Sequence, residues 1–301
     1  MPGLFTAILS VFCYSFAYVL LHKGQVETEA EDNGLFPVLL VGSITLGIAA
    51  LVFIVVKYHG FGFVGSLTKE QWQGYGLASL SGLIGTLAGR LVVYAAIRRI
   101  GATRGIVVES AEAIVTTVLA VVLLGEVFRT NDFVGVALLA GGISLLVTER
   151  TFLKERFLLN QGIVLGLLGA VLQGGGHFLR KVGMSASIVP VIAAALDLML
   201  ALLVYVCILW YLGRLRKYFR HYIHNWNPYL VTAGIMSATG VLLFFAAVRA
   251  MPVSEAAMIV GVQPILVTVL SKLFFRRLEP ITWMTGIYSL LVALGIIMLQ
   301  T

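Results

Sequence analysis

Charged side chains are scarce in this sequence. Lys, Arg, Asp and Glu make up 12% of the 301 residues, whereas soluble domains carry about 25%. This shortage of surface charge excludes an ordinary soluble fold. Hydrophobic residues instead reach 59%, and they gather in long runs such as Leu35–Val56, Ile188–Leu212 and Ile281–Leu299. Runs of about 20 apolar residues are long enough to cross the ~30 Å core of a bilayer as helices.

Cysteine is also rare. Cys13 and Cys207 both fall inside apolar runs, where we expect buried, reduced thiols, because disulfide frameworks belong to small secreted folds. The sequence has no Cys/His spacing typical of a metal site, no phosphate-binding loop for ATP and no nucleophile motif. We therefore expect no resident cofactor, no metal centre and no enzymatic activity.

The apolar runs predict an all-α polytopic membrane protein with ten transmembrane helices. The expected spans are roughly 3–22, 35–57, 74–98, 101–124, 130–148, 161–181, 187–212, 228–250, 253–274 and 280–300. The longest polar stretches between them are 23–34, 58–73, 149–160 and 213–227. The first of these stretches is acidic, and the last is basic and aromatic. None of them is long enough to form a soluble domain.

The two halves of the sequence resemble each other. The run Ala95–Arg98 matches Ala246–Arg249, and in both copies a short loop and a long apolar helix follow, ending at Glu126 or Glu279. The chain is therefore predicted to consist of two five-helix repeats, residues 1–149 and 160–301. Because five is odd, consecutive repeats cross the membrane in opposite senses. Such inverted repeats are typical of secondary transporters.

The order of these features resembles the EamA branch of the drug/metabolite transporter superfamily. Three short motifs support the resemblance: Leu124-Gly125-Glu126 at a helix end, Gln263-Pro264 in the ninth span, and a Gly-rich sixth span ending Phe178–Lys181. The resemblance covers the whole chain. It implies a carrier of small metabolites, often amino acids, that works by alternating access around a central cavity. In one departure, the fourth span has Glu112-Ala113 where the ninth has Gln263-Pro264.

Glu109 and Glu112 lie inside the fourth span, where a charge is costly. Being three residues apart, they should share one helix face. Counted from the hairpin turn near Gly101, Arg90 should lie level with Glu112, and Tyr94 next to Glu109. Two interpretations are open. Either Arg90 and Glu112 form a buried ion pair that only holds helices together, or the carboxylates line a cavity, where Glu112 binds a proton or substrate amine and Arg90 a substrate carboxylate.

Further polar side chains in the spans are candidates for substrate binding or coupling: Tyr14, Tyr18, Gln173, His177 and Gln263. Packing or ordinary hydrogen bonding is the alternative for the two tyrosines, which share a face of the first span. Gln173 and His177 flank three glycines, which commonly allow close helix packing and would otherwise leave room for a substrate, with His177 carrying a proton. Asp197 in the seventh span is expected to lie level with Gln173 and to hydrogen-bond to it.

The basic residues bear on orientation. With Arg90 set aside, six Lys and Arg fall on the side that would hold both termini and 14 on the other side. The positive-inside rule then places both termini outside, whereas the family resemblance implies termini in the cytoplasm. The net charge of +7 concerns lipid headgroups and topology, and it gives no reason to expect a nucleic-acid partner.

Together these features predict a secondary transporter, a multi-pass protein of the inner (cytoplasmic) membrane that moves a small metabolite such as an amino acid or amine. The expected partners are the lipid bilayer, a small-molecule substrate and protons, and the protein would be a monomer or homodimer. The alternative is a non-transporting scaffold or a subunit of a lipid-modifying assembly. Its signature would be a well-packed core without a cavity, in which Arg90, Glu109 and Glu112 satisfy one another.

Overall fold

A computed structural model describes residues 2–28, 32–124, 130–152, 156–250, 262–275 and 282–298. Over these residues the secondary structure is helical, without a β-strand. The elements are α1 (Pro2–Thr28), α2 (Leu35–Tyr58), the 3-10 helix η1 (Phe61–Ser66), α3 (Lys69–Ser81), the π-helical segment η2 (Gly82–Gly89), α4 (Arg90–Ile100), α5 (Ala102–Glu109), α6 (Glu112–Leu124), α7 (Thr130–Phe152), α8 (Arg156–Ser185), α9 (Pro190–Tyr211), α10 (Leu215–His224), α11 (Pro228–Ala250), α13 (Gln263–Phe274) and α14 (Trp283–Met298).

The lengths and hydropathies of the helices are those of a multi-pass membrane protein. Among the described residues, seven helical stretches are long and apolar enough to cross a bilayer: Gly3–Thr28, Leu35–Tyr58, Lys69–Ile100, Ala102–Leu123, Gln161–Ser185, Pro190–Tyr211 and Pro228–Ala250. Three shorter apolar helices, Phe133–Thr148, Gln263–Phe274 and Trp283–Met298, fall within the remaining expected spans. The expected all-α membrane fold is therefore confirmed, while the number of ten spans and their inversion stay predictions.

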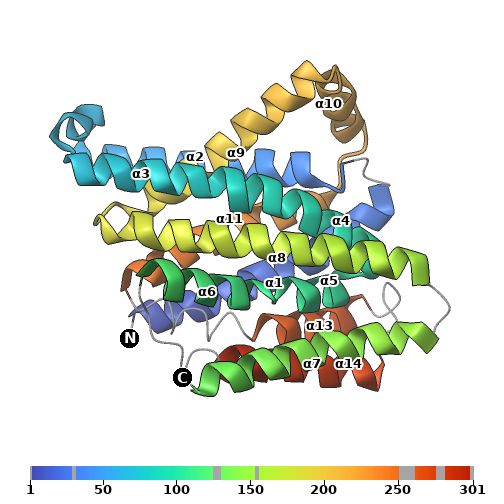
Figure 1. The fold of residues 1–301 in the computed structure, drawn as a ribbon. Coiled ribbons are helices and arrows are strands. Elements are labelled where there is room, and N and C mark those ends of the chain that lie inside the picture. The colour runs from blue at the N-terminus through green and yellow to red at the C-terminus, as the bar shows by residue number, and fades with distance from the viewer. Residues whose placement is uncertain are drawn as a thin grey trace.

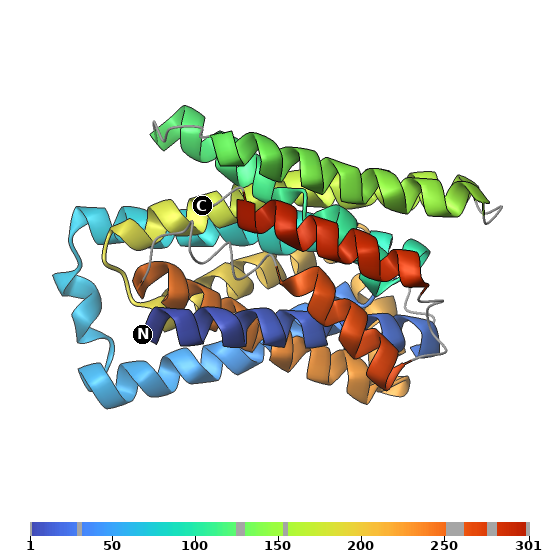
Figure 2. The same ribbon diagram turned by 90° about the horizontal axis from the view of Figure 1, so that it is seen from below.

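The helices lie side by side in a layered bundle (Figure 1). In this bundle α1 packs along α11, α2 contacts α11 and α9, and α8 contacts α3, α4, α5 and α6. Seen from below, α7 and α14 form a pair along one edge (Figure 2). The start of α1 and the end of α14 lie toward the same end of the bundle.

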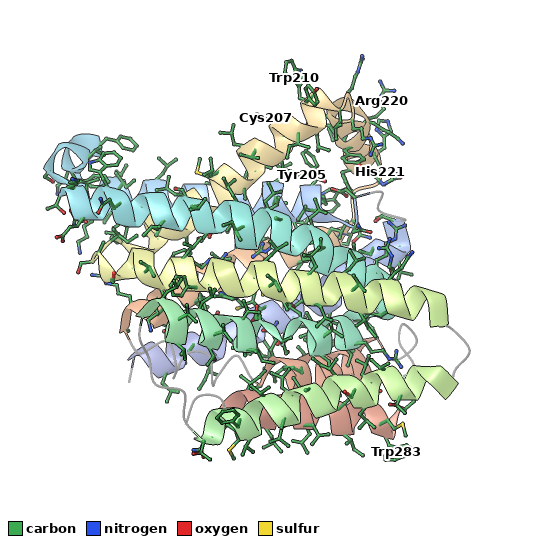
Figure 3. All side chains as sticks on the ribbon, in the orientation of Figure 1. Tyr205, Cys207, Trp210, Arg220, His221 and Trp283 are labelled. Atoms are coloured by element: carbon green, nitrogen blue, oxygen red, sulfur yellow. The ribbon has the colours of Figure 1, made fainter. Side chains whose placement is uncertain are left out.

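The tryptophans mark the ends of the membrane helices. Trp72 lies in the first turn of α3, Trp210 in the last turn of α9, Trp226 just after α10 and Trp283 at the start of α14, and all four are more than half exposed. Figure 3 shows Trp210 at the outer end of α9 and Trp283 at the start of α14. Because tryptophan is enriched where a bilayer meets water, these positions indicate the headgroup regions.

The third span is a single helical stretch, but its middle is not an α-helix. Residues Gly82–Gly89 are π-helical, with the α-helices α3 and α4 on either side. Close contact with α9 accompanies this change, because a Cβ added to Gly82 would lie 2.1 Å from the carbonyl oxygen of Asp197. Only glycine permits so close an approach of two backbones.

The fourth span is interrupted between its two glutamates. Helix α5 ends at Glu109 and α6 begins at Glu112. At the interruption the backbone hydrogen bonds join residues three apart, where an α-helix joins residues four apart. The Ala111 N–H donates to the Val108 carbonyl and the Ala113 N–H donates to the Ser110 carbonyl, both at 3.2 Å. The fourth span is therefore two helices joined by a tight turn, and both glutamates line the same two cavities.

The glycines of the sixth span serve close packing at two positions. A Cβ added to Gly174 would lie 2.9 Å from the carbonyl oxygen of Glu112, and one added to Gly176 would lie 2.7 Å from the Cα of Gly85. Small residues at such crossings let membrane helices approach closely. At Gly174 and Gly176 the packing interpretation is thus supported, and space for a substrate is not.

Several expected boundaries differ from the structure. Helix α8 is longer than expected at both ends, and the basic stretch 213–227 contains the helix α10. Cys13 is buried as expected, whereas Cys207 is exposed, because its side of α9 faces away from the bundle. Some predicted features lie outside the described residues: Glu126 and Glu279, with which the matching helices of the two halves were expected to end, and residues 253–261 of the expected ninth span.

The contact at Gly82 leads to a stability prediction. We expect Gly82→Ala to lower the free energy of unfolding by about 1–3 kcal/mol, the usual cost of overpacking, because the new Cβ collides with the α9 backbone. Gly76→Ala is the matched control, since no atom lies within 4 Å of a Cβ at that position of α3. Thermal unfolding of the detergent-purified protein would measure both variants, and equal stability of the two would contradict the close contact.

Candidate functional site

The polar centre of the protein lies at the starts of the helices α6 and α13. Glu112 is the first residue of α6, and Gln263 is the first residue of α13. The two residues occupy corresponding positions in the two halves of the sequence. The first N–H groups of a helix lack intrahelical partners and carry the positive end of its dipole.

Two small adjoining cavities occupy this centre. One has a volume of about 20 Å³ and is lined by Tyr14, Tyr18, Arg90, Glu109, Glu112, Gln173, His177, Arg180, Phe244 and Gln263. The other, of about 40 Å³, shares Glu109, Glu112, His177, Phe244 and Gln263 with it. All predicted site residues except Tyr94 thus line the first cavity. Each cavity has room for about one or two water molecules.

Glu109 is buried and hydrogen-bonded. Its Oε1 accepts a hydrogen bond from the hydroxyl of Tyr18 and another from Nε2 of Gln173, each at 3.2 Å. The Tyr18 ring in turn packs edge-on against the ring of Tyr94, with centroids 6.4 Å apart. This carboxylate therefore joins α1, α5 and α8, and two of the predicted site residues hold it in place.

Glu112 makes a different set of contacts. Its Oε2 lies 3.4 Å from Nε2 of His177 and has no hydrogen-bond partner among the described residues. Nδ1 of the same histidine lies 3.3 Å from Nη1 of Arg180. His177 therefore lies between the carboxylate of Glu112 and the guanidinium of Arg180.

Arg180 is held by a buried ion pair with Asp197 of α9. Nε of Arg180 lies 3.1 Å from Oδ1 and Nη2 lies 3.4 Å from Oδ2. Asp197 also accepts hydrogen bonds from Ser81 at 2.7 Å and from Thr86 at 2.5 Å, and Nη2 donates to the Thr86 hydroxyl at 2.7 Å. The four side chains are at most 2% exposed. This network joins α3, the π-helical segment, α8 and α9.

A continuous polar chain therefore runs from Asp197 through Arg180 and His177 to Glu112. Glu112 lies at the end of this chain that borders the two cavities.

Arg90 is 3% exposed and lies at the start of α4, directly after the π-helical segment. The Tyr94 hydroxyl is hydrogen-bonded with the side chains of Arg90 and Ser237. The Nη1 group of Arg90 has no hydrogen-bond partner among the described residues, and neither has the hydroxyl of Tyr14. Both groups line the first cavity, where they leave donors available.

Two predicted contacts are wrong. Arg90 and Glu112 line one cavity but form no ion pair, because Glu112 faces His177 from the start of a separate helix. Asp197 does not bond to Gln173. The turn of their hairpin, between Ser185 and Pro190, lies later in the chain than expected. Asp197 is therefore level with Arg180, which lies about two helical turns beyond Gln173 in α8.

Sequence reasoning missed Arg180, Ser81 and Thr86. Arg180 was expected at the end of the sixth span, but α8 continues to Ser185 and buries it. One signal was available, because Arg180 follows Gln173 by seven residues and His177 by three, so that all three share a helix face. Among the described residues, no group of three or more His, Cys, Asp or Glu side chains is placed to hold a metal ion.

The ion pair leads to a second stability prediction. Asp197→Ala should lower the free energy of unfolding by about 3–5 kcal/mol, because it leaves the buried guanidinium of Arg180 without a counter-charge. The double variant Asp197→Leu with Arg180→Met should recover a large part of this loss, since it removes both charges. Chemical unfolding in detergent would measure each protein, and a single variant as stable as the wild type would refute the assignment.

Comparison with known proteins agrees with this architecture. The EamA-like transporter family matches residues 1–148 and 160–301 of the chain. One solved crystal structure is similar with a TM-score of 0.61 and 16% sequence identity, over 97% of this chain and 94% of that chain, which shows the fold alone. No curated protein is significantly similar to the chain. Because the family match extends over nearly the whole sequence, the chain belongs to the EamA-like transporter family, within the drug/metabolite transporter superfamily.

Proposed function

We propose that this protein is a secondary transporter of the cytoplasmic membrane that moves an amino acid, an amine or a related small metabolite in exchange for protons. The observation that carries the proposal is the central cavity, in which Oε2 of Glu112 and Nη1 of Arg90 are buried without hydrogen-bond partners. A buried charged group left without partners costs free energy. Such groups in a membrane protein therefore suggest a ligand that supplies the missing contacts.

The charges of the cavity suggest the substrate class. Arg90 offers a hydrogen-bond donor to a carboxylate, and the Tyr14 hydroxyl lines the same cavity. Glu112 offers an acceptor to an ammonium group. An amino acid carries both complementary groups, whereas a simple amine would use Glu112 alone. Gln263, the uncharged counterpart of Glu112 in the second half, completes the lining.

The volumes of the cavities support alternating access. At about 20 and 40 Å³ they exclude even a small amino acid, so the described conformation is closed and the helices must separate to admit a substrate. We take α6 and α13, which both begin at the cavities, as equivalent parts of two inverted five-helix repeats. Broken helices at the interface between such repeats form the binding sites of many secondary transporters.

We propose proton coupling because the carboxylate of Glu112 lies where the substrate would bind. A proton and a substrate ammonium group each neutralise this carboxylate, so the two would bind in competition. Exchange of one for the other across the membrane would then couple substrate movement to a proton gradient. His177, which contacts Arg180, and Glu109, which is tied to Tyr18 and Gln173, would act as positioning groups.

The scaffold alternative fits fewer of the contacts. A purely structural core requires Arg90, Glu109 and Glu112 to satisfy one another. Glu109 has its own hydrogen-bond donors, but Arg90 and Glu112 each keep an unpartnered atom at a cavity. The transporter proposal accounts for these two atoms, and the scaffold does not.

The role of Glu112 is tested in sealed proteoliposomes with a pH-sensitive dye inside. A panel of amino acids and amines is added to wild-type protein, and we expect a substrate-dependent pH change that Glu112→Gln abolishes. Glu70→Gln is the control, because Glu70 is exposed in the first turn of α3, far from the cavities.

Each result has a distinct meaning. Proton movement that persists in Glu112→Gln would remove Glu112 from the coupling mechanism. Substrate flux without any proton movement in the wild type would refute coupling but keep the transporter. Absence of flux for the whole panel, with folded protein, would favour the scaffold.

The role of Arg90 predicts a difference between substrates. Arg90→Gln should raise the apparent KM for amino acids by about tenfold or more, because a hydrogen bond to a charged group contributes about 1.5–3 kcal/mol. The KM for the corresponding amines, which lack the carboxylate, should change little. Uptake of radiolabelled amino acid and amine pairs measures this difference. An equal change for both substrates would show that Arg90 acts on the structure and not on the carboxylate.

A further inference from the structure

A short basic helix lies outside the bundle of membrane helices. Helix α10 carries several cationic side chains and no acidic residue. It buries Tyr218 and Tyr222 and leaves Phe219 and Ile223 more than half exposed. A helix with cationic residues and exposed apolar side chains is typical of segments that lie in the membrane interface.

An open groove of about 620 Å³ lies beneath this helix. Its lining residues come from α2 (Phe36, Leu40), α9 (Val206, Trp210), the connection after it (Gly213) and α10 (Leu215, Arg216, Phe219). Helix α9 diverges from α2 toward its C-terminal end, and α10 lies at that outer end (Figure 1). Among the described residues that line the groove, Arg216 is the charged one and the others are apolar or glycine.

The walls of the groove are joined by one carboxylate. Asp32 accepts hydrogen bonds from the N–H groups of Gly34 at 3.2 Å and Phe36 at 2.6 Å, at the start of α2. It also accepts from the hydroxyls of Tyr205 at 3.3 Å and of Tyr222. Burial raises the pKa of the Tyr222 hydroxyl, so this group remains a donor over the physiological pH range. The groove is therefore a fixed feature of the fold.

Three arginines of this region have no acidic partner among the described residues. Among the described residues, no ion pair includes any of the three arginines Arg214, Arg216 and Arg220. The described acids nearby are used elsewhere, since Asp32 joins the groove walls and Glu27 pairs with Lys23 at 2.7 Å. Arg220 and Trp210 extend from the outer end of α9 and α10, away from the bundle (Figure 3). Arg214, Arg216 and Arg220 are also exposed.

A second groove offers an internal comparison. It has a volume of about 370 Å³ and lies between α2, η1, α3 and α9, at the other end of α2. Phe61, Trp72 and Met199 are among its lining residues, and no described residue of the lining is charged. An acyl chain would bury apolar surface in either groove, but a negative headgroup would find a cation in the groove beneath α10 alone.

We propose that the groove between α2, α9 and α10 binds an anionic phospholipid, with an acyl chain between Leu40 and Val206 and the headgroup phosphate on Arg216. The apolar lining matches an acyl chain, and Arg216, which has no acidic partner among the described residues, matches a phosphate. The exposed Trp210 ring at the end of α9 is of the kind enriched where headgroups begin. A soluble anion would match Arg216 but would leave the apolar lining without a partner. Zwitterionic lipid would fill the groove but would gain less from the uncompensated positive charge of α10.

The binding is measured on the full-length protein in a neutral detergent, by titrating phospholipids whose acyl chains carry bromine. Bromine quenches tryptophan fluorescence on contact, and the part of the quenching that Trp210→Phe removes reports on this groove. We expect brominated phosphatidylglycerol to quench Trp210 at lower concentration than brominated phosphatidylcholine. Glycerol 3-phosphate should not displace the lipid, because it has no acyl chain.

The contribution of the headgroup contact is measured with Arg216→Gln. This variant should reduce the preference for phosphatidylglycerol by about fivefold, the factor expected for one cation near a membrane surface. Arg216→Lys should keep most of the preference. Arg214→Gln is the matched control, because it removes the same charge two residues away at a position that does not line the groove. Since both arginines are exposed, neither variant should affect folding.

Three outcomes would overturn the proposal. Equal quenching by the two phospholipids would show that the groove does not distinguish an anionic headgroup from a zwitterionic one. An equal loss of preference in Arg214→Gln and Arg216→Gln would show a diffuse attraction and no site in the groove. Displacement of the lipid by glycerol 3-phosphate would show a site for a soluble phosphate compound.

Discussion

The arrangement of the core helices depends on the buried ion pair between Arg180 and Asp197. A bilayer supplies no water to either charge, so each must find its partners inside the protein. Asp197 can do so only if α9 lies directly against the third span, where Ser81 and Thr86 donate to it. That contact in turn requires the bare backbone of Gly82. One electrostatic requirement thus sets the spacing of three helices and the position of the π-helical segment between them.

The same ion pair also determines what happens at the centre. Because Asp197 holds Arg180, the guanidinium can direct Nη1 at His177, which in turn lies against Glu112. The fully satisfied end of the polar chain is therefore rigid, and the incompletely satisfied end lies at Glu112, beside the interruption of the fourth span. Within this one network, Asp197 and Arg180 fix the structure, whereas Glu112 remains available to a ligand.

The sequence was sufficient to predict the membrane environment of the protein and several residues of the site, but not the contacts between those residues. Composition and apolar runs were sufficient for an all-α membrane protein, and the cost of charge in a membrane was sufficient to single out Glu109, Glu112 and Arg90. The partners of these residues depend on helix interruptions, which a pattern of apolar residues does not reveal. Arg180 was overlooked for a related reason: a cation near the expected end of a span is ordinarily exposed, and its burial depends on where α8 ends.

The π-helical segment has a consequence for Arg90. A π-helical stretch accommodates an additional residue compared with an α-helix, and each residue of an α-helix turns the following side chains by about 100°. Without the extra residue, Arg90 would start α4 about a quarter-turn or more away from its present azimuth and would point away from the cavity. The direction in which the Arg90 side chain points therefore depends on the rotation about the helix axis that accumulates over the preceding residues. A change between π and α geometry in Gly82–Gly89 would rotate Arg90 in or out of the cavity.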